Sequence, residues 1–321
     1  MVALTFTSGQ SRESGACWCE AATLADRTDD AREACRNAQG AFDGGGRGLP
    51  GTRDPLSDQS ASRCRGGRSG GAVLASPEPI KGRVNQKPHL LFPWLNALIR
   101  DRRIVDAVED VLGPDILCWS SQFFAKPAGD PAYTSWHQDG TYWGLSSHDV
   151  VTAWLALTPS TRQSGCMQVV PGTHHEQVRH EDKFDETNML SRGQEIAVTV
   201  DPATVIDVEL APGEMSLHHV LLFHGSERNR AEHPRIGFAI RYVATHVRQR
   251  SPIRESATLV RGTDTYGHFE PESPPEADMH PDAVARHGAI IDRQLRILYE
   301  GAQQRGKLGP AEAERRSGTL M

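Results

Sequence analysis

Cysteine, basic blocks and long apolar runs are all scarce in this sequence, and each absence excludes a class of protein. The six cysteines form no Cys-x-x-Cys pair and no framework spacing, which predicts reduced thiols in the cytoplasm rather than a disulfide scaffold. No apolar run approaches the roughly 20 residues of a membrane-spanning helix, and the N-terminus lacks the basic and apolar regions of a signal peptide. The net charge is −6 with no strongly basic stretch. We therefore expect neither a membrane nor a nucleic-acid partner.

Sustained apolar periodicity is also missing from residues 1–86. This segment is rich in Gly, Arg, Ser, Asp and Ala, with GGGRG at 44–48 and RCRGGRSGG at 63–71. Such a composition predicts a low-complexity segment that is disordered or atypical, in which only 22–39 has a helix-like pattern. At the other end, we expect 303–321 to be a frayed tail. The residues between, 87–302, are expected to form a single domain.

Apolar periodicity within 87–302 predicts short strands with a few flanking helices. Helical spacing in 89–113, broken at Asp101, predicts two helices, and the amphipathic stretch 281–301 predicts another. The strand-like runs, most of them ended by Pro or Gly, are 116–126, 150–159, 166–175, 205–226 and 235–247. Between them, 176–200 is expected to be a lid or surface loop, and 248–280 a loop over the mouth of the domain. This pattern indicates a mainly β fold, either a barrel or a sandwich.

One short stretch, WHQDG at 136–140, carries the first candidate metal ligands. On an extended strand, His137 and Asp139 point to the same face, because side chains alternate with a period of two. With a distant imidazole at His224 they make a set of two histidines and one carboxylate. Such a set binds iron(II) and leaves adjacent coordination positions open for a cosubstrate and dioxygen.

Arg235 strengthens this interpretation, because it follows His224 by eleven residues at the start of the next apolar run. A guanidinium there could bind a dicarboxylate in bidentate fashion. A buried arginine without a partner is very costly, so an inward-facing Arg235 implies a bound anion. The alternative is a surface arginine that pairs with Glu227 or Glu232.

Four segments resemble the phytanoyl-CoA dioxygenase family, in the same order along the chain. They are WHQDGTYWG (136–144), VTAWLALTPS (151–160), GCMQVVPGTHH (165–175) and HHVLLFHGSERNRAEHPR (218–235). The resemblance covers residues 87–300. It implies a double-stranded β-helix, also called a jelly roll or cupin-like fold, and an enzyme that uses iron(II), 2-oxoglutarate and dioxygen. It does not specify a substrate.

The resemblance also implies roles for individual residues. It makes His137, Asp139 and His224 the iron ligands, and Arg235 the residue that binds the distal carboxylate of 2-oxoglutarate. Other residues match positions that line the cosubstrate: Ser226 as a hydrogen-bond donor to that carboxylate, Trp154 against the carbon chain, and Gln122. Structural roles remain open for the last two.

Several other side chains near these motifs need an assignment. His218 and His219 compete with His224 for the distal ligand position. The family pattern has a histidine matching His219, but its strand parity is opposite to that of His224, which indicates a supporting or packing role. The remaining nearby histidines lie beyond a strand end and are expected to be solvated: His174, His175 and His180. Four aromatic residues are either walls of a substrate pocket or core packing: Phe124, Trp136, Tyr142 and Trp143.

The function predicted from these observations is hydroxylation of an aliphatic carbon of a small metabolite, with release of succinate and CO2. The aspartate at 139 favours hydroxylation, because the halogenating relatives have a small residue there. No cradle for CoA phosphates is visible. The alternative is a jelly-roll metal-binding protein without oxygenase activity, from a truncated or degenerate family member. A zinc hydrolase is not supported, because no His-Glu-x-x-His pair exists.

Overall fold

The computed structural model describes residues 2–4, 82–183 and 185–300, all of which belong to one unit of the chain. The expectations for the helix-like stretch 22–39, for most of the segment 1–86 and for the tail 303–321 lie outside these residues and stay predictions. None of the helices in the described ranges is long and apolar enough to cross a membrane.

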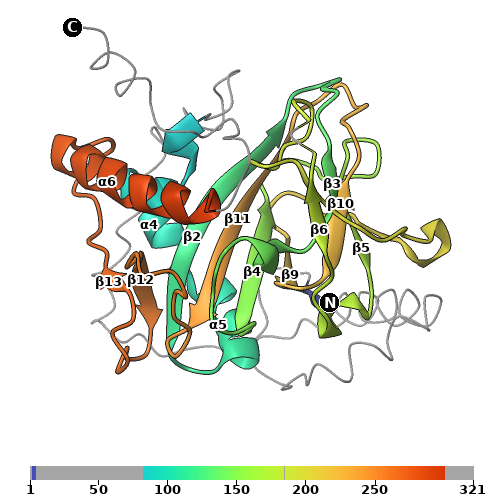
Figure 1. Cartoon of the computed structure of the whole chain (residues 1–321). Coiled ribbons are helices and arrows are strands. Elements are labelled where there is room, and N and C mark those ends of the chain that lie inside the picture. The colour runs from blue at the N-terminus through green and yellow to red at the C-terminus, as the bar shows by residue number, and fades with distance from the viewer. Residues whose placement is uncertain (1, 5–81, 184, 301–321) are drawn as a thin grey trace, which may run out of the picture. The chain divides into compact units, whose positions relative to one another are not determined.

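Two β-sheets form the centre of the described part of the chain (Figure 1). The larger has seven strands in the order β1-β9-β4-β11-β2-β12-β13, and the smaller has four in the order β3-β10-β5-β8. The bounds in the larger sheet are β1 (Val2–Leu4), β2 (Ile116–Lys126), β4 (Val150–Ala156), β9 (Met215–His219), β11 (Arg235–Ala244), β12 (Ser256–Arg261) and β13 (Glu270–Pro271). Those in the smaller sheet are β3 (Thr134–His137), β5 (Met167–Val170), β8 (Ile206–Val208) and β10 (Phe223–Ser226).

Neighbouring strands in both sheets come from distant parts of the sequence, which is the connectivity of a double-stranded β-helix. The predicted mainly β jelly-roll fold is therefore confirmed. The sheets pack face to face around a shared apolar cluster, to which β4 and β11 contribute from one side and β5 and β8 from the other: Trp154, Ala156, Met167, Val169, Val208, Leu210, Leu222 and Ala239. The candidate ligands lie on β3, just after it, and on β10, at the edge of this core.

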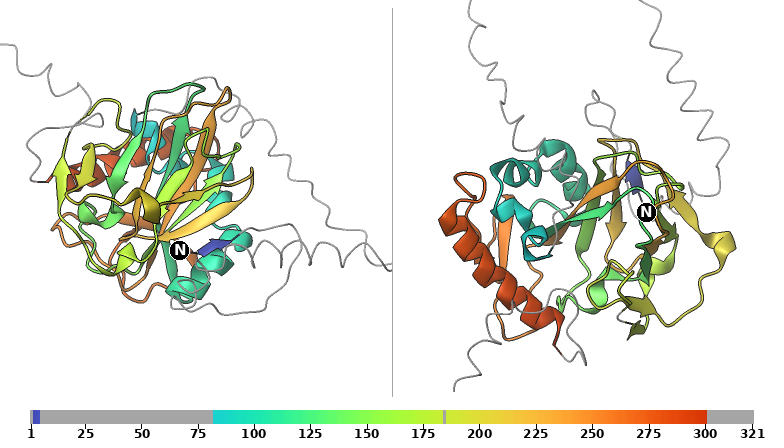
Figure 2. Two further views of the ribbon diagram at one scale, coloured as in Figure 1. Left: turned by 90° about the vertical axis from the view of Figure 1, so that its right-hand side faces the viewer. Right: turned by 90° about the horizontal axis from the view of Figure 1, so that it is seen from above.

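Within the described residues, three α-helices accompany the larger sheet: α4 (Pro93–Leu98), α5 (Arg102–Leu112) and α6 (Pro281–Leu298). The predicted break at Asp101 is confirmed, because its side chain caps α5 by accepting a hydrogen bond from the Arg103 backbone N–H. α5 ends at Gly113, which has a positive φ of 84°. The helices lie on the side of the larger sheet away from β3, β5 and β10, so the inner face is left to the site (Figure 2).

The short helical turns are η1 (Gly82–Asn85), η2 (Pro88–Leu90), η3 (Asp139–Thr141), η4 (Thr173–His175) and η5 (Pro202–Thr204). The first of these is tied to the domain, because Arg83 pairs with Asp292 at 2.6 Å and Asn85 exchanges hydrogen bonds with the backbone of Phe123. Ordered contacts therefore begin before residue 87, where the sequence pattern placed the start of the domain.

Short strands occur in segments whose sequence pattern did not predict them. The predicted loop 248–280 contains β12, which pairs with β2 through Thr258 and Cys118, and the short β13. The predicted lid 176–200 contains a hairpin of β6 (His180–Asp182) and β7 (Gln194–Ile196). Residues 2–4 form β1 and pair with β9, while the expectation of a disordered or atypical segment 1–86 stays a prediction. β12 and β13 are short and carry several polar residues, so their pairing depends on the strand edge beside them, β2 for β12 and β12 for β13, rather than on an apolar pattern of their own.

Candidate active site

His137 and His224 lie opposite each other across the β3–β10 pair. Each ring donates Nδ1–H to the backbone carbonyl two residues before it, His137 to Ser135 at 2.9 Å and His224 to Leu222 at 2.9 Å. A carbonyl can only accept, so these bonds fix the tautomer and leave each Nε2 lone pair available. Both rings are buried. This is the arrangement that metal-binding histidines require.

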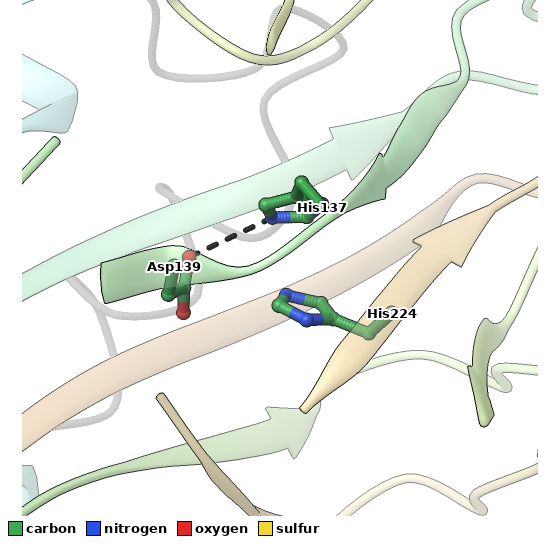
Figure 3. A group of neighbouring side chains, drawn as sticks. All are labelled: His137, Asp139 and His224. Carbon is green, nitrogen blue, oxygen red and sulfur yellow. Dashed lines mark ion pairs between the residues drawn. The ribbon is translucent and has the colours of Figure 1, made fainter. Parts of the chain in front are cut away.

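Asp139 completes the cluster from the turn that follows β3 rather than from the strand itself. Its Oδ1 lies 3.6 Å from His137 Nε2, and one ligand atom from each of the three side chains lies within 4.8 Å of the others (Figure 3). Gln138 between them keeps an extended backbone, so the expected same-face alternation survives the end of the strand.

Gln138 is fully buried and has a structural role that the sequence pattern did not indicate. Its Nε2 donates to the carbonyls of Glu176 and Leu221, both at 2.7 Å, and its Oε1 accepts from the Val178 backbone N–H at 2.8 Å. Because three partners from two other segments hold this side chain, its two neighbours project together into the site.

The Asp139 carboxylate is held in its charged form. Burial opposes ionisation, but the proximity of His137 and His218, with His224 and Arg241 beyond them, outweighs it, so the pKa of Asp139 lies well below its usual value. Burial, followed by the proximity of His137, lowers the pKa of His224 well below its usual value. An ionised carboxylate beside a neutral imidazole is the protonation state in which such groups bind a metal.

His218, and not His219, faces the cluster. His218 is buried, its Nε2 lies 3.8 Å from Asp139 Oδ2, and its ring centroid is 4.8 Å from that of His224. His219 is half-buried on the other side of β9, with its ring 5.7 Å from His174. The supporting role that strand parity and the family pattern suggested for His219 therefore belongs to its neighbour.

The expectation that His180 is solvated was also wrong. It is half-buried, and its Nε2 accepts a hydrogen bond from the Gln138 backbone N–H at 2.8 Å. Burial lowers the pKa of His180 to about 4. A neutral ring is needed for this acceptor role, so His180 supports the turn that carries Asp139.

Arg235 lines the same small cavity, about 50 Å³, as the three candidate ligands. It is 3 % exposed, its Nε has no hydrogen-bond partner among the described residues, and burial lowers its pKa to about 10. It forms no ion pair with Glu227 or Glu232 in the described part of the chain; Glu227 pairs with Arg230 instead. An inward-facing, unpaired guanidinium is the state that implies an anion.

Ser226 and Trp154 line this cavity beside Arg235. The Ser226 hydroxyl accepts a hydrogen bond from Lys126 Nζ at 2.7 Å, which leaves its own O–H free to donate. The Trp154 ring lies 5.4 Å from the Arg235 guanidinium. Lys126 is a basic residue beside the site that the sequence pattern passed over, because its place there depends on the pairing of β2 with β11.

Gln122 lies in a second, larger cavity of about 450 Å³ rather than in the first. The two cavities share three lining residues: Phe124, Asp139 and Arg241. Of the other predicted wall residues, Trp143 lies beside Arg241, Trp136 packs in a cluster with Val170, Ile196 and Phe223, and Tyr142 lies under Arg192.

Comparison with known proteins agrees with this geometry. The family described as phytanoyl-CoA dioxygenase (PhyH) matches residues 75–237, just over half of the chain and including all three candidate ligands and Arg235. The chain belongs to the phytanoyl-CoA dioxygenase family. A probable alpha-ketoglutarate-dependent hypophosphite dioxygenase of Stutzerimonas stutzeri is 28% identical over 189 residues, covering 58% of this chain and 62% of that protein. A probable phytanoyl-CoA dioxygenase of Caenorhabditis elegans is 33% identical over 142 residues, covering 40% of this chain and 44% of that protein.

Among solved structures, the apo form of the non-heme monooxygenase ThoJ matches with a TM-score of 0.62 and 36% identity, covering 68% of this chain and 81% of that one. Its nickel complex matches with a TM-score of 0.57 and 32% identity, over 67% and 79% of the two chains. The chain spans less than two thirds of the length of the two relatives named above from bacterium and worm.

Proposed function

We propose that this protein is an iron(II)- and 2-oxoglutarate-dependent dioxygenase that hydroxylates an aliphatic carbon of a small metabolite and releases succinate and CO2. One observation carries this proposal. Three ligand atoms from two histidines and an aspartate lie within 4.8 Å of one another, in a cavity lined also by a buried arginine whose Nε has no hydrogen-bond partner among the described residues. The names of relatives that use alpha-ketoglutarate support the same activity.

In this proposal His137, Asp139 and His224 hold the iron and leave adjacent positions open. The donor set fits iron(II), since both imidazoles present a free Nε2 and the carboxylate is ionised. The bound iron would supply activation of dioxygen, coupled to the decarboxylation of 2-oxoglutarate. The side chains of this chain fix the geometry and exclude water from the site.

Arg235 and Ser226 bind the distal carboxylate of 2-oxoglutarate, and Lys126 orients the Ser226 hydroxyl. The guanidinium supplies paired donors, and the Ser226 hydroxyl adds a third because Lys126 already occupies its acceptor side. Trp154 covers the carbon chain next to Arg235. In the larger cavity Gln122 contacts the substrate rather than the cosubstrate.

Formation of succinate from 2-oxoglutarate, with purified protein, iron(II) and air, tests this proposal. Wild-type protein is expected to form succinate slowly alone and faster with a true substrate from a metabolite panel, whose product gains one oxygen atom. His224→Ala is expected to abolish both rates. A metal-binding protein without oxygenase activity would bind iron and form no succinate above the rate of free iron, which would refute the proposal.

We also propose that the protein acts in the cytoplasm. Cys118 and Cys166 are free and buried thiols, a state that a reducing compartment maintains. Cell fractionation with an antibody to the chain would test the location, and recovery in a membrane or secreted fraction would refute it.

A further inference from the structure

Arg241 is a second buried arginine of the site, and the proposed reaction gives it no task. It lies on β11 six residues after Arg235. The strand is regular between them, so both side chains point to the same face. Their Cα atoms are about 20 Å apart at the usual rise of a strand. Both side chains line the cavity of the candidate ligands, and the proposed function assigns only Arg235 to the distal carboxylate of 2-oxoglutarate.

The guanidinium of Arg241 lies over two aromatic rings. It lies 5.8 Å from the centroid of the Phe124 ring and 5.2 Å from that of the Trp143 ring. Arginine stacks on aromatic rings through its faces, which leaves the N–H groups at its edge to bind oxygen atoms. Trp143 in turn packs on Trp119, with ring centroids 5.0 Å apart. The guanidinium is therefore positioned before any ligand arrives.

The donors at this edge are unused within the described residues. Arg241 is 8 % exposed, and its Nε is buried without a hydrogen-bond partner among the described residues. Burial lowers the pKa of Arg241, and Asp139 is near enough for its charge to oppose this shift but forms no ion pair with it. Leaving such donors buried and unpaired is costly, so the position indicates an anionic partner that comes from outside the chain.

The space next to Arg241 is the larger cavity, which meets the metal-side cavity at Phe124, Asp139 and Arg241. At about 450 Å³ it has the volume of a small-molecule site. Its wall combines polar groups, such as Ser120 and Gln122, with apolar ones, such as Phe123 and Leu190. A ligand anchored at Arg241 would therefore place its adjacent carbon atoms beside the candidate iron ligands.

We propose that Arg241 anchors an oxyanion of the primary substrate, a carboxylate or a phosphorus oxyanion carried on a small organic body that fills the larger cavity. This inference rests on the proposed oxygenase function for the chemistry that follows, but not for the binding itself. Arg241 selects the substrate and sets which carbon faces the iron. The fluorescence of the neighbouring Trp143 is expected to change when a ligand binds to Arg241.

Tryptophan fluorescence of the full-length chain, titrated with propylphosphonate, butyrate and the uncharged butyramide, tests the proposal. The first titration uses the metal-free chain carrying Arg235→Gln, so that anions cannot bind to the other arginine. The second uses the chain with Arg235 intact, in its anaerobic complex with iron(II) and 2-oxoglutarate. At least one of the two anions is expected to bind saturably and the amide is not. The anion preferred tells a carboxylate substrate from a phosphonate one.

Arg241→Gln is expected to weaken anion binding by about 10- to 100-fold, the range for loss of a charge-assisted contact, and Arg241→Lys to restore part of it. The exposed Arg250→Gln is the matched control and should bind as wild type does. Thermal melting verifies that each variant is folded. Equal binding by wild type and Arg241→Gln, or equal binding of the amide, would overturn the proposal.

A second measurement separates this proposal from the proposed function and from a role in holding Asp139. The iron(II)–2-oxoglutarate chelate gives a visible charge-transfer band, which Arg241→Gln should retain. Loss of the band in that variant alone would assign Arg241 to support of Asp139 and overturn the substrate proposal. Absence of the band in wild type would count against the oxygenase function, while the metal-free titration would still decide the role of Arg241.

Discussion

Lys126 and Arg235 are directly opposed residues of the β2–β11 pair, and both are buried. Like charges opposite each other in a sheet repel, the more strongly when burial removes water. Lys126 donates to the Ser226 hydroxyl and to the backbone carbonyls of Ser226 and Glu227, but the pair has no carboxylate between its members in the described part of the chain. Folding therefore brings two repelling positive charges together, and binding of the 2-oxoglutarate dianion reduces this repulsion.

The binding of 2-oxoglutarate is expected to weaken as pH rises. Burial, together with the Arg235 guanidinium, lowers the pKa of Lys126 to about 6, so above that pH the empty site loses a proton. The cosubstrate carboxylate favours the charged amine, so binding takes up a proton. The apparent dissociation constant should therefore rise by up to about tenfold per pH unit above pH 6.

Titration of the anaerobic charge-transfer band across this pH range measures the effect. Lys126→Met should remove the pH dependence, whereas the exposed Lys183→Met, on the β6–β7 hairpin, should keep it. The same slope in Lys126→Met as in wild type would contradict the linkage.

Replacing Arg235 by methionine is expected to move stability and cosubstrate affinity in opposite directions. Removal of a buried, unpaired guanidinium should raise the free energy of unfolding of the ligand-free chain by about 1 kcal/mol or more. The dissociation constant for 2-oxoglutarate should rise by about 10- to 100-fold, because charge-assisted bonds are lost. Denaturant unfolding and the chelate band report the two quantities. Unchanged stability and unchanged affinity together would place Arg235 outside the binding site.

Asp139→Ala is expected to abolish hydroxylation, because it removes the anionic ligand and leaves two neutral imidazoles. Iron affinity should fall by more than the roughly 10- to 100-fold expected for loss of an outer partner. Thr152→Val is the matched control, since the Thr152 hydroxyl donates to Asp139 Oδ2 at a long 3.4 Å. Anaerobic iron titration and oxygen incorporation into product measure the two effects. Full activity of Asp139→Ala would contradict its assignment, and halide incorporation would show that chloride can enter the vacated position.

The candidate ligands were predictable from the sequence because their geometry is local. His137 and Asp139 need only an extended segment to share a face, and Gln138 maintains that segment. The strand β2 has the bounds that its apolar run indicated, 116–126. Arg235 was also predictable from the sequence, because it is the first residue of a recognisable strand and follows His224 by eleven residues.

Other parts of the site depend on pairing between distant strands, and no local pattern encodes that. Lys126 becomes part of the site only through the register of β2 with β11, and Arg241 only because Phe124 and Trp143 flank it. β12 was missed because a short run gains strand structure from the edge of β2. The choice between His218 and His219 depended on the course of the chain between β9 and β10, where residues 220–222 lie outside both strands and the alternation of side chains is not continuous.

Gly237→Ala is expected to disturb the cosubstrate pocket through Trp154. The indole ring lies across Gly237 so closely that an added methyl group would overlap it. The ring must shift, at a cost of about 1–3 kcal/mol in unfolding free energy, and its cover over the Arg235 cavity is lost with it. Gly288→Ala, in α6 with open space at its Cβ position, is the control and should stabilise by about 0.5–1 kcal/mol. Thermal melting and 2-oxoglutarate titration distinguish the two, and an unchanged melting temperature in Gly237→Ala would contradict the overlap.

A buried charged cluster far from the candidate ligands should govern acid stability. Glu272 pairs with Lys87 at 2.7 Å, and both side chains are 1 % exposed. The same carboxylate accepts from Ser256 at 2.7 Å and Thr258 at 2.6 Å, and lies 3.4 Å from His89. The cluster joins the segment before α4 to β12, so its loss would release the edge of the larger sheet.

Glu272→Gln is expected to destabilise the chain by about 3–5 kcal/mol, because Lys87 is left as an uncompensated buried charge. Glu181→Gln breaks an exposed pair with Lys183 and should cost at most about 1 kcal/mol. The double variant Lys87→Met, Glu272→Leu should recover most of the loss, because it removes both charges. A small effect of Glu272→Gln alone would contradict the account of this cluster.

The same cluster gives a sign for the pH dependence of stability. Burial opposes ionisation of Glu272, but the charge of Lys87 outweighs it and holds the pKa of Glu272 well below its usual value. The contribution of Glu272 is therefore fully present above the unfolded-state pKa of about 4.5 and is lost as pH falls below it. Burial lowers the pKa of His89 as well, so protonation of His89 weakens the fold in the same direction, from about pH 6.5 downward. Denaturant unfolding between pH 7 and 3 should show a steeper acid loss in wild type than in the double variant, and parallel curves would exclude this cluster as the cause.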